Sequence, residues 1–450
     1  MSFYIRAVSV IVCLIPCLAL AQAPESSFRD GEIHTMITTS SVHRYKVVVA
    51  PMKVEGLRLA DSSEKMMSIR NIIIDDLDFS LRFDALNRRV DEFSLASLSS
   101  SKGRVDFNAW QATGAEYLVA GSFIELERTP MVEIRVYDLG LEDLVFLRNY
   151  TVDFAALRRT AHHISDDIVF NVTGERGVAS TLIAFRMHTG KGTSEIFYSD
   201  YDGYGLAGIT SDSSIAMMPS WSPDGRKIAY TSFKSTDQDL YSVDLKNKKN
   251  SPLRTAKGVD MAAVWCESNG FLCFSSGVVG NQEIYYLRPG EGRPVRITFS
   301  YAMDIEPFWS PNGEEIVFAS TRAGNPHIFI MGSDGLNVRR ITFESRNTTP
   351  RWRPLPYGDK ILLTSEIRGI FQIAVIDVNG DNFIQLTTDR ENRYASWSPD
   401  GLHIVFSSDR RGGWGNFELF TMDWDGNSQR PLRKKFSPAR EPAWSPFLER

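Results

Sequence analysis

The chain has 450 residues, which leaves room for two or three domains. Hydrophobic residues make up 43% of it and charged residues 23%, which are ordinary values for a globular protein. The formal net charge is −5, and the basic runs at 246–250 and 433–435 are short. These features favour a globular protein with no nucleic-acid partner.

The N-terminus has the features of a secretory signal. Arg6 precedes an apolar stretch at 7–20, and the small residues Ala19 and Ala21 predict cleavage after Ala21. The stretch is short for a membrane span, and Pro16 interrupts it. The sequence therefore predicts an exported protein that is peripheral to the cell envelope and spans no membrane.

Export would leave two of the four cysteines, Cys266 and Cys273, which flank the turn of one predicted hairpin. In an oxidising compartment they could form a disulfide between neighbouring strands. Alternatively, both replace small residues of the preceding repeat and remain thiols. The strand register decides between the two, because it sets the distance between the Cβ atoms.

Four segments are predicted along the chain. Residues 1–21 form the signal peptide, and 22–44 form a flexible arm in which 32–37 alternates enough to pair as a strand. An α/β domain is predicted over residues 45–174, and a repeat domain over residues 178–450.

The α/β domain alternates strand and helix patterns. A β-branched run at 45–52 predicts a buried strand, and strands are predicted at 116–123, 131–138 and 144–152. Helices are predicted at 61–80, at 107–114 after Asp106, and from Asp153 to Gly174. Apolar stripes mark the two long helices, the first formed by Met66, Ile69, Ile73 and Leu77. Together they predict a small sheet with helices on one face.

The second half of the chain is a series of repeats. Tryptophans recur every 43 to 47 residues, at Trp221, Trp265, Trp309, Trp352, Trp397 and Trp444, and three of them, Trp221, Trp309 and Trp397, begin W-S-P-D/N-G motifs. This period, with four strand signals per repeat, is typical of a β-propeller. The sixth repeat is cut off after Trp444, and its missing strands stand at 182–187, 195–203 and 207–210. We therefore predict a six-bladed β-propeller closed by strands from both ends of the domain.

The sequence lacks the motifs of the common catalytic and metal sites. The chain has no G-x-S-x-G elbow and no H-E-x-x-H pair, and the helix neighbours His162 and His163 point about 100° apart. The acidic turns, such as 201–205 and 424–428, lack the spacing of a calcium loop and suit tight turns. The sequence thus predicts a non-enzymatic protein with no catalytic residue, cofactor or metal.

Symmetry gives a better candidate site. The position three before each tryptophan should form a ring at one end of the propeller channel, at Met218, Ala262, Glu306, Thr349, Tyr394 and Glu441. Loops on one face of a propeller commonly bind partners, and nearby methionines such as Met261 and Met303 add an adaptable apolar surface. The alternative is that the ring only closes the channel.

The combination of domains resembles the TolB family of the Tol-Pal system. The resemblance rests on 199–205 (SDYDGYG), the W-S-P repeats, 442–448 (PAWSPFL) and 161–174 (AHHISDDIVFNVTG), together with 47–52. It covers nearly the whole exported chain. The second repeat departs from the pattern at Cys266, Glu267 and Ser268, and the fourth carries an insertion at 353–358.

The resemblance implies a periplasmic, monomeric scaffold that supports outer-membrane integrity and cell division. It implies binding of the lipoprotein Pal by the propeller face and of TolA by the N-terminal arm, with contacts to other outer-membrane proteins. Carried over by position, the residues facing Pal are Asp260, Met261, Ala262, Asp304, Ile305, Glu306, Pro307, Asn347, Thr348, Thr349 and Pro350. Those facing TolA are Glu32, Ile33, His34, Thr35, Met36 and Ile37.

Two other classes of protein remain open. An enzymatic propeller would need carboxylates or histidines near the channel mouth, where Glu306 and Glu441 stand on the ring. A propeller that binds polysaccharide or peptidoglycan would be favoured by solvent-facing aromatics such as Tyr301 and Tyr394.

Overall fold

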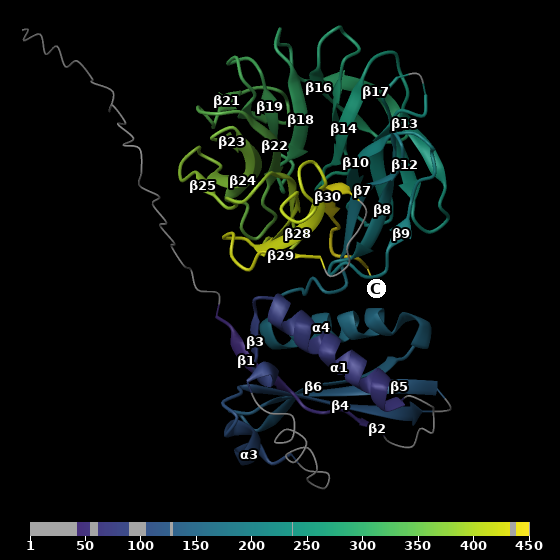
Figure 1. Ribbon diagram of the computed structural model, residues 1–450, viewed down its shortest axis with the longest axis vertical. Coiled ribbons are helices and arrows are strands. Elements are labelled where there is room, and N and C mark those ends of the chain that lie inside the picture. Colours follow the sequence, from purple (N-terminus) through teal and green to yellow (C-terminus); the bar gives the residue numbers. More distant parts are fainter. Residues whose placement is uncertain are drawn as a thin grey trace, which may run out of the picture. The chain divides into compact units, whose positions relative to one another are not determined.

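The structure is a computed structural model, and it describes residues 43–54, 62–89, 105–126, 129–235, 237–432 and 438–449. The predicted signal peptide and the arm at 22–42 lie outside these residues. Figure 1 shows an α/β domain followed in the chain by a β-propeller.

The α/β domain is built on one mixed sheet with strand order β3-β1-β4-β5-β6, and the short β2 also pairs with β4. Strands β1, β2 and β3 run parallel to their partners, whereas β4, β5 and β6 form an antiparallel meander. The strands are β1 Tyr45–Val49, β2 Lys53–Val54, β3 Phe83–Ala85, β4 Tyr117–Leu126, β5 Thr129–Asp138 and β6 Asp143–Thr151.

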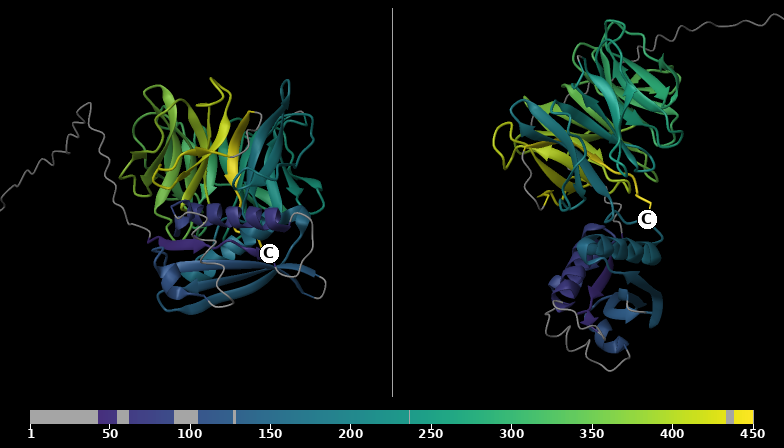
Figure 2. Two further views of the ribbon diagram at one scale, coloured as in Figure 1. Left: turned by 60° about the horizontal axis from the view of Figure 1, so that its bottom comes forward. Right: turned by 90° about the vertical axis from the view of Figure 1, so that its right-hand side faces the viewer.

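The two long helices, α1 (Ser62–Phe79) and α4 (Leu157–Thr173), cover one face of this sheet, as Figures 1 and 2 show. The predicted stripe of α1 is fully buried there, against strand residues such as Val47 and Val119. The opposite face carries the short α3 (Phe107–Gln111), whose Trp110 packs on Val48 and Leu118. The prediction that the two long helices lie on one face of the sheet is therefore confirmed, and the short α3 lies on the other face.

Capping explains where the helices begin and end. Asp106 accepts a hydrogen bond from the amide of Ala109 and caps α3 as predicted. Asp153 instead caps a 3₁₀ turn, η2 (Phe154–Ala156), and α4 begins one turn later than expected. Gly174 ends α4 in the left-handed conformation that glycine adopts most readily. A second 3₁₀ turn, η1 (Leu86–Arg88), follows β3.

The propeller confirms the repeat analysis, because the described residues form six four-stranded antiparallel sheets. Blades 1 to 3 comprise β10 Ala216–Trp221, β11 Lys227–Ser232, β12 Asp239–Asp244, β13 Asn250–Arg254, β14 Asp260–Trp265, β15 Leu272–Ser276, β16 Glu283–Arg288, β17 Glu291–Arg296, β18 Asp304–Trp309, β19 Glu315–Ser320, β20 His327–Gly332 and β21 Arg339–Arg340. Blades 4 to 6 comprise β22 Asn347–Trp352, β23 Lys360–Ile367, β24 Ile370–Asp377, β25 Ile384–Gln385, β26 Asn392–Trp397, β27 His403–Ser408, β28 Glu418–Asp423, β29 Arg430–Pro431, β30 Ala439–Trp444, β7 Leu182–Gly190, β8 Thr193–Asp200 and β9 Ala207–Gly208.

The W-S-P-D-G motif forms the turn between the first two strands of a blade. In blade 1, Asp224 accepts hydrogen bonds from the Ser222 hydroxyl at 2.5 Å and from the Arg226 amide at 3.0 Å. Gly225 has φ +66°, and a Cβ there would lie 2.4 Å from Leu448. The motif is therefore needed for the turn and for close packing against the C-terminal segment.

Blade 6 closes the ring with strands from both ends of the domain, as predicted. Its sheet order is β30-β7-β8-β9, with Trp444 opposite Ile183. Figure 1 shows the C-terminal β30 beside β7 and β8. The amide of Ser445 donates to the carbonyl of Leu182 at 2.8 Å, which extends the pairing beyond the strand.

The end of α1 packs on blades 5 and 6. Phe79 stacks on His403, with ring centroids 4.0 Å apart, and also contacts Tyr201. Burial, together with nearby arginines such as Arg430, lowers the pKa of His403 well below its usual value. The stacked imidazole is therefore neutral at pH 7, which suits an apolar contact.

The two cysteines of blade 2 are buried free thiols. Val264, rather than Cys266, lies opposite Cys273 in the β14–β15 register. This register corresponds to the alternative in which the cysteines replace small core residues.

Candidate functional site

The six symmetry-related positions do come together. Each lies in a β-bulge of the innermost strand of its blade and has a positive φ between 50° and 56°. They surround a small cavity of about 30 Å³, enough for a water molecule. A positive φ is uncommon outside glycine, so its recurrence at six different residue types marks a constraint of the fold.

Hydrogen bonds from the adjacent blade stabilise these bulges. The Glu441 carboxylate accepts from the Met218 amide, and the Glu306 carboxylate accepts from the Thr349 amide, both at 2.7 Å. Burial raises the pKa of Glu306, and the Glu441 charge adds to this, although the Thr349 amide and Arg351 oppose it. Both carboxylates therefore join neighbouring blades.

Three other predicted positions are also engaged within the blades. Asp260 is buried and pairs with Arg254 at 2.8 Å, and Asp304 is buried and pairs with Arg322 at 2.8 Å. Asn347, at the equivalent place in blade 4, donates to the carbonyl of Glu344. These side chains shape the entrance to each innermost strand, and the residues after them, such as Met261 and Ile305, are only half buried.

We call the end of the channel from which the innermost strands begin the loop face, and the end with the W-S-P-D-G turns the turn face. Exposed apolar side chains gather on the loop face of blades 2 to 4. They are Val278, Val279, Phe299, Tyr301, Met303 and Phe343. Arg296 lies 4.5 Å from the Phe299 ring centroid, and Arg340 lies 4.8 Å from that of Phe343, so two of the aromatic rings are held in place.

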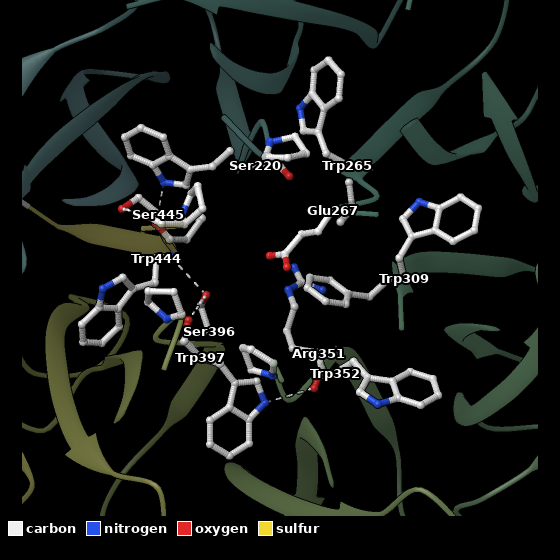
Figure 3. Close-up of a pocket in the computed structure, with 18 of the residues that line it drawn as sticks. Ser220, Trp265, Glu267, Trp309, Arg351, Trp352, Ser396, Trp397, Trp444 and Ser445 are labelled. Carbon is white, nitrogen blue, oxygen red and sulfur yellow. Dashed lines mark hydrogen bonds between the residues drawn. The ribbon is translucent and has the colours of Figure 1, made fainter. Parts of the chain in front are cut away.

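A second cavity of about 110 Å³ lies toward the turn face and is lined by the W-S-P segments (Figure 3). The labelled tryptophans point away from its centre, whereas Glu267 and Arg351 reach inward. The symmetry argument did not single out these two residues as site candidates. A signal was nevertheless present, because Glu267 replaces the motif proline in the second repeat. Arg351 stands where other repeats have Ser220 or Phe308.

The predicted arm residues 32–37 lie outside the residues that the structure describes. Within the described ranges, no helix is both long and apolar enough to cross a bilayer.

The fold and its channel define a class: a two-domain protein in which an α/β domain precedes a six-bladed propeller whose channel is lined by repeated W-S-P segments. Residues 34–144 match the model of the TolB amino-terminal domain, and residues 170–448 match that of the TolB beta propeller domain. The chain belongs to the TolB family.

Individual relatives agree with this assignment. The Tol-Pal system protein TolB of Bordetella pertussis is 28% identical over 368 residues, covering 80% of this chain and 82% of the relative. A TolB homologue of Chlorobium luteolum is 33% identical over 346 residues, covering 77% and 78%. The crystal structure of TolB from Acinetobacter baumannii superposes with a TM-score of 0.74 at 25% identity, covering 90% of this chain and 97% of that one.

Proposed function

We propose that this protein is a non-enzymatic periplasmic scaffold of the Tol-Pal system that binds the lipoprotein Pal on its loop face. The observation that supports this is the group of exposed apolar side chains on blades 2 to 4. They lie on the connections that flank the strands beginning at Asp260, Asp304 and Asn347, which the family resemblance selects. Contiguous exposed apolar surface is typical of protein interfaces, and aromatic, Met and Arg residues are enriched there.

Within this surface, Tyr301 is the best probe. Its side chain is fully exposed, whereas Glu306 lies inside the channel and accepts the Thr349 amide. A change at Glu306 would therefore disturb the packing of two blades as well as any partner contact. Truncating Tyr301 removes surface that a partner could contact, and it breaks none of the hydrogen bonds found among the described residues of the propeller.

Calorimetric titration of the chain from Gln22 with the soluble domain of Pal from the same organism tests this proposal. We expect saturable binding, weakened at least about tenfold by Tyr301→Ala, because truncated interface hot spots commonly cost 2 kcal/mol or more. The matched control is Phe383→Ala, an exposed aromatic that precedes β25 on the turn face, which should bind as the unchanged chain does. If both variants weakened Pal binding equally, the contact with Pal would not lie on the loop face around Tyr301.

Absence of Pal binding by a correctly folded chain would favour the other classes of protein. Titration with peptidoglycan fragments then separates a polysaccharide-binding propeller from a protein scaffold. The two ring carboxylates of Glu306 and Glu441 already hold backbone amides of the next blade, which favours the scaffold over a reaction in the channel.

We also propose that the arm binds TolA by strand addition through residues 32–37, whose alternating pattern suits pairing with an exposed sheet edge. A chain that begins at His43 should lose binding to the soluble domain of TolA. The same shortened chain should keep the fold of residues 43–449 and the affinity for Pal. Undiminished TolA binding by the shortened chain would contradict the assignment of this partner to the arm.

A further inference from the structure

One cluster of side chains outside the channel has the composition of a metal site. His162 lies on α4, Asp200 is the last residue of β8, and Asp202 lies in the turn that follows. One potential ligand atom from each of the three residues lies within 4.8 Å of the other two. The cluster joins a helix of the α/β domain to blade 6.

The His162 ring is oriented by a carboxylate. Its Nδ1 lies 2.8 Å from Asp76 Oδ2, and the hydroxyl of Tyr201 donates to Asp76 Oδ1 at 2.6 Å. Histidines that ligate metals commonly bind a carboxylate through the second ring nitrogen, which fixes the tautomer and raises the basicity of the first. Asp76 therefore leaves Nε2 as the nitrogen available to a ligand.

The His162 side chain is only 3% exposed. Its Nε2 is therefore shielded from solvent, and it has no hydrogen-bond partner among the described residues. Buried polar atoms in folded proteins are nearly always paired, so this unpaired nitrogen requires an explanation. Asp200 and Asp202 lie beside this ring, so a ligand shared with their carboxylates would satisfy the nitrogen.

The Asp200 carboxylate lies within reach of the charges of His162, Arg158 and Arg159, and none of the hydrogen bonds found among the described residues ends on its oxygens. Gly205 lies beside it with φ +66°, and a Cβ at that position would come within 3.1 Å of Asp200 Oδ2. Asp202 accepts the Tyr204 amide through Oδ1 and pairs with Arg158 through Oδ2. The turn thus presents two carboxylates to the buried imidazole and leaves space around the first.

We propose that His162 Nε2, Asp200 and Asp202 bind a divalent first-row transition ion, with Zn²⁺ as the representative. Zinc accepts imidazole nitrogen and carboxylate oxygen in sites with three protein ligands, and water takes the fourth position. Tetrahedral ligands at about 2.1 Å lie about 3.4 Å apart. The three ligand atoms, which lie within 4.8 Å of one another, therefore move closer by about an ångström on binding. A nitrogen ligand disfavours Ca²⁺, which takes oxygen ligands.

Arg158 opposes the cation, because its guanidinium pairs with Asp202 and lies 3.9 Å from the ring centroid of Tyr204. Two kinds of variant should therefore change the metal affinity in opposite directions. Removing a ligand carboxylate should weaken metal binding, whereas removing the competing positive charge should strengthen it. General destabilisation of the fold would not produce the second effect.

The experiment is Zn²⁺ titration of the chain from Gln22 by calorimetry, with the bound metal counted by mass spectrometry after dialysis. The expected result is one Zn²⁺ per chain, with Ca²⁺ failing to compete. Asp200→Asn should weaken binding at least about tenfold, a loss comparable to those seen when metal-site partners are removed. Arg158→Ala should tighten it.

The matched control is Asp377→Asn. Asp377 occupies the same place in the equivalent turn of blade 4, where its amide and carbonyl make the same turn hydrogen bonds, but it pairs with Lys360. This variant should bind Zn²⁺ as the unchanged chain does. The proposal is overturned if the unchanged chain retains no zinc, if Asp200→Asn and Asp377→Asn bind equally, or if Arg158→Ala weakens binding.

Discussion

Trp444→Ala is expected to lower the free energy of unfolding by about 3 to 5 kcal/mol, the usual cost of truncating a large buried aromatic side chain. Trp444 is 6% exposed, and its indole nitrogen donates to the Thr181 hydroxyl at 2.8 Å. Its backbone amide donates to the Ser396 hydroxyl of blade 5 at 3.1 Å. Trp444 therefore connects the last strand both to the segment before β7 and to blade 5. Urea denaturation measures the loss of stability.

The matched control is Trp414→Ala, since Trp414 is 79% exposed in the segment between β27 and β28. That change should alter the free energy of unfolding by no more than about 0.5 kcal/mol. Deletion of residues 444–450 should be more damaging than Trp444→Ala because it also removes the Ser445–Leu182 pairing. An unchanged melting temperature after the deletion would refute closure of the ring by β30.

Glu283→Ala should be nearly as destabilising, by about 3 kcal/mol, because it leaves several buried donors without an acceptor. The Glu283 side chain is fully buried at the start of β16. It accepts from Arg296 at 2.8 Å, from the Thr298 hydroxyl at 2.5 Å and from the Ser300 amide at 2.9 Å. Thermal or urea unfolding of the purified variant measures the effect.

Glu283→Gln provides the control, since blade 4 has Gln372 at the equivalent position. There the Gln372 side chain accepts from the Thr387 hydroxyl at 2.7 Å and from Asn392 at 2.9 Å. The amide keeps an acceptor oxygen and should lose less than half as much stability as alanine does. If Glu283→Ala and Glu283→Gln had the same small effect on the free energy of unfolding, the idea that the carboxylate organises the outer strand of blade 2 would be wrong.

The architecture was predictable because it depends on local patterns repeated along the chain. The tryptophan period and the turn motif predicted the blades, and the truncated last repeat predicted the closure seen between Trp444 and Ile183. The stripe on α1 was likewise predictable, because helical periodicity reports which face is buried. The start of α4 was missed by one turn, since Asp153 caps a 3₁₀ turn as readily as an α-helix.

The candidate site was only partly predictable. Repeat symmetry located the ring at Met218 and its equivalents, but did not show that Glu306 and Glu441 hold amides of adjacent blades. Glu267 and Arg351 differ from the residues at the equivalent positions of the other repeats, and this difference is visible in the sequence. The sequence does not show, however, that both side chains point into the channel. The exposure of Tyr301 and Phe299 depends on how far their connecting segment stands out from the loop face.

The sequence by itself determined the number of blades, the closure of the ring and the family, because each follows from spacing and residue type within short segments. Only the tertiary structure decided which polar side chains are committed to the fold and which remain available. The pairing of Asp76 with His162 spans 86 residues, and Tyr201 lies a further 39 residues beyond His162. No local pattern encodes such a contact, because it exists only when α1, α4 and blade 6 have packed together.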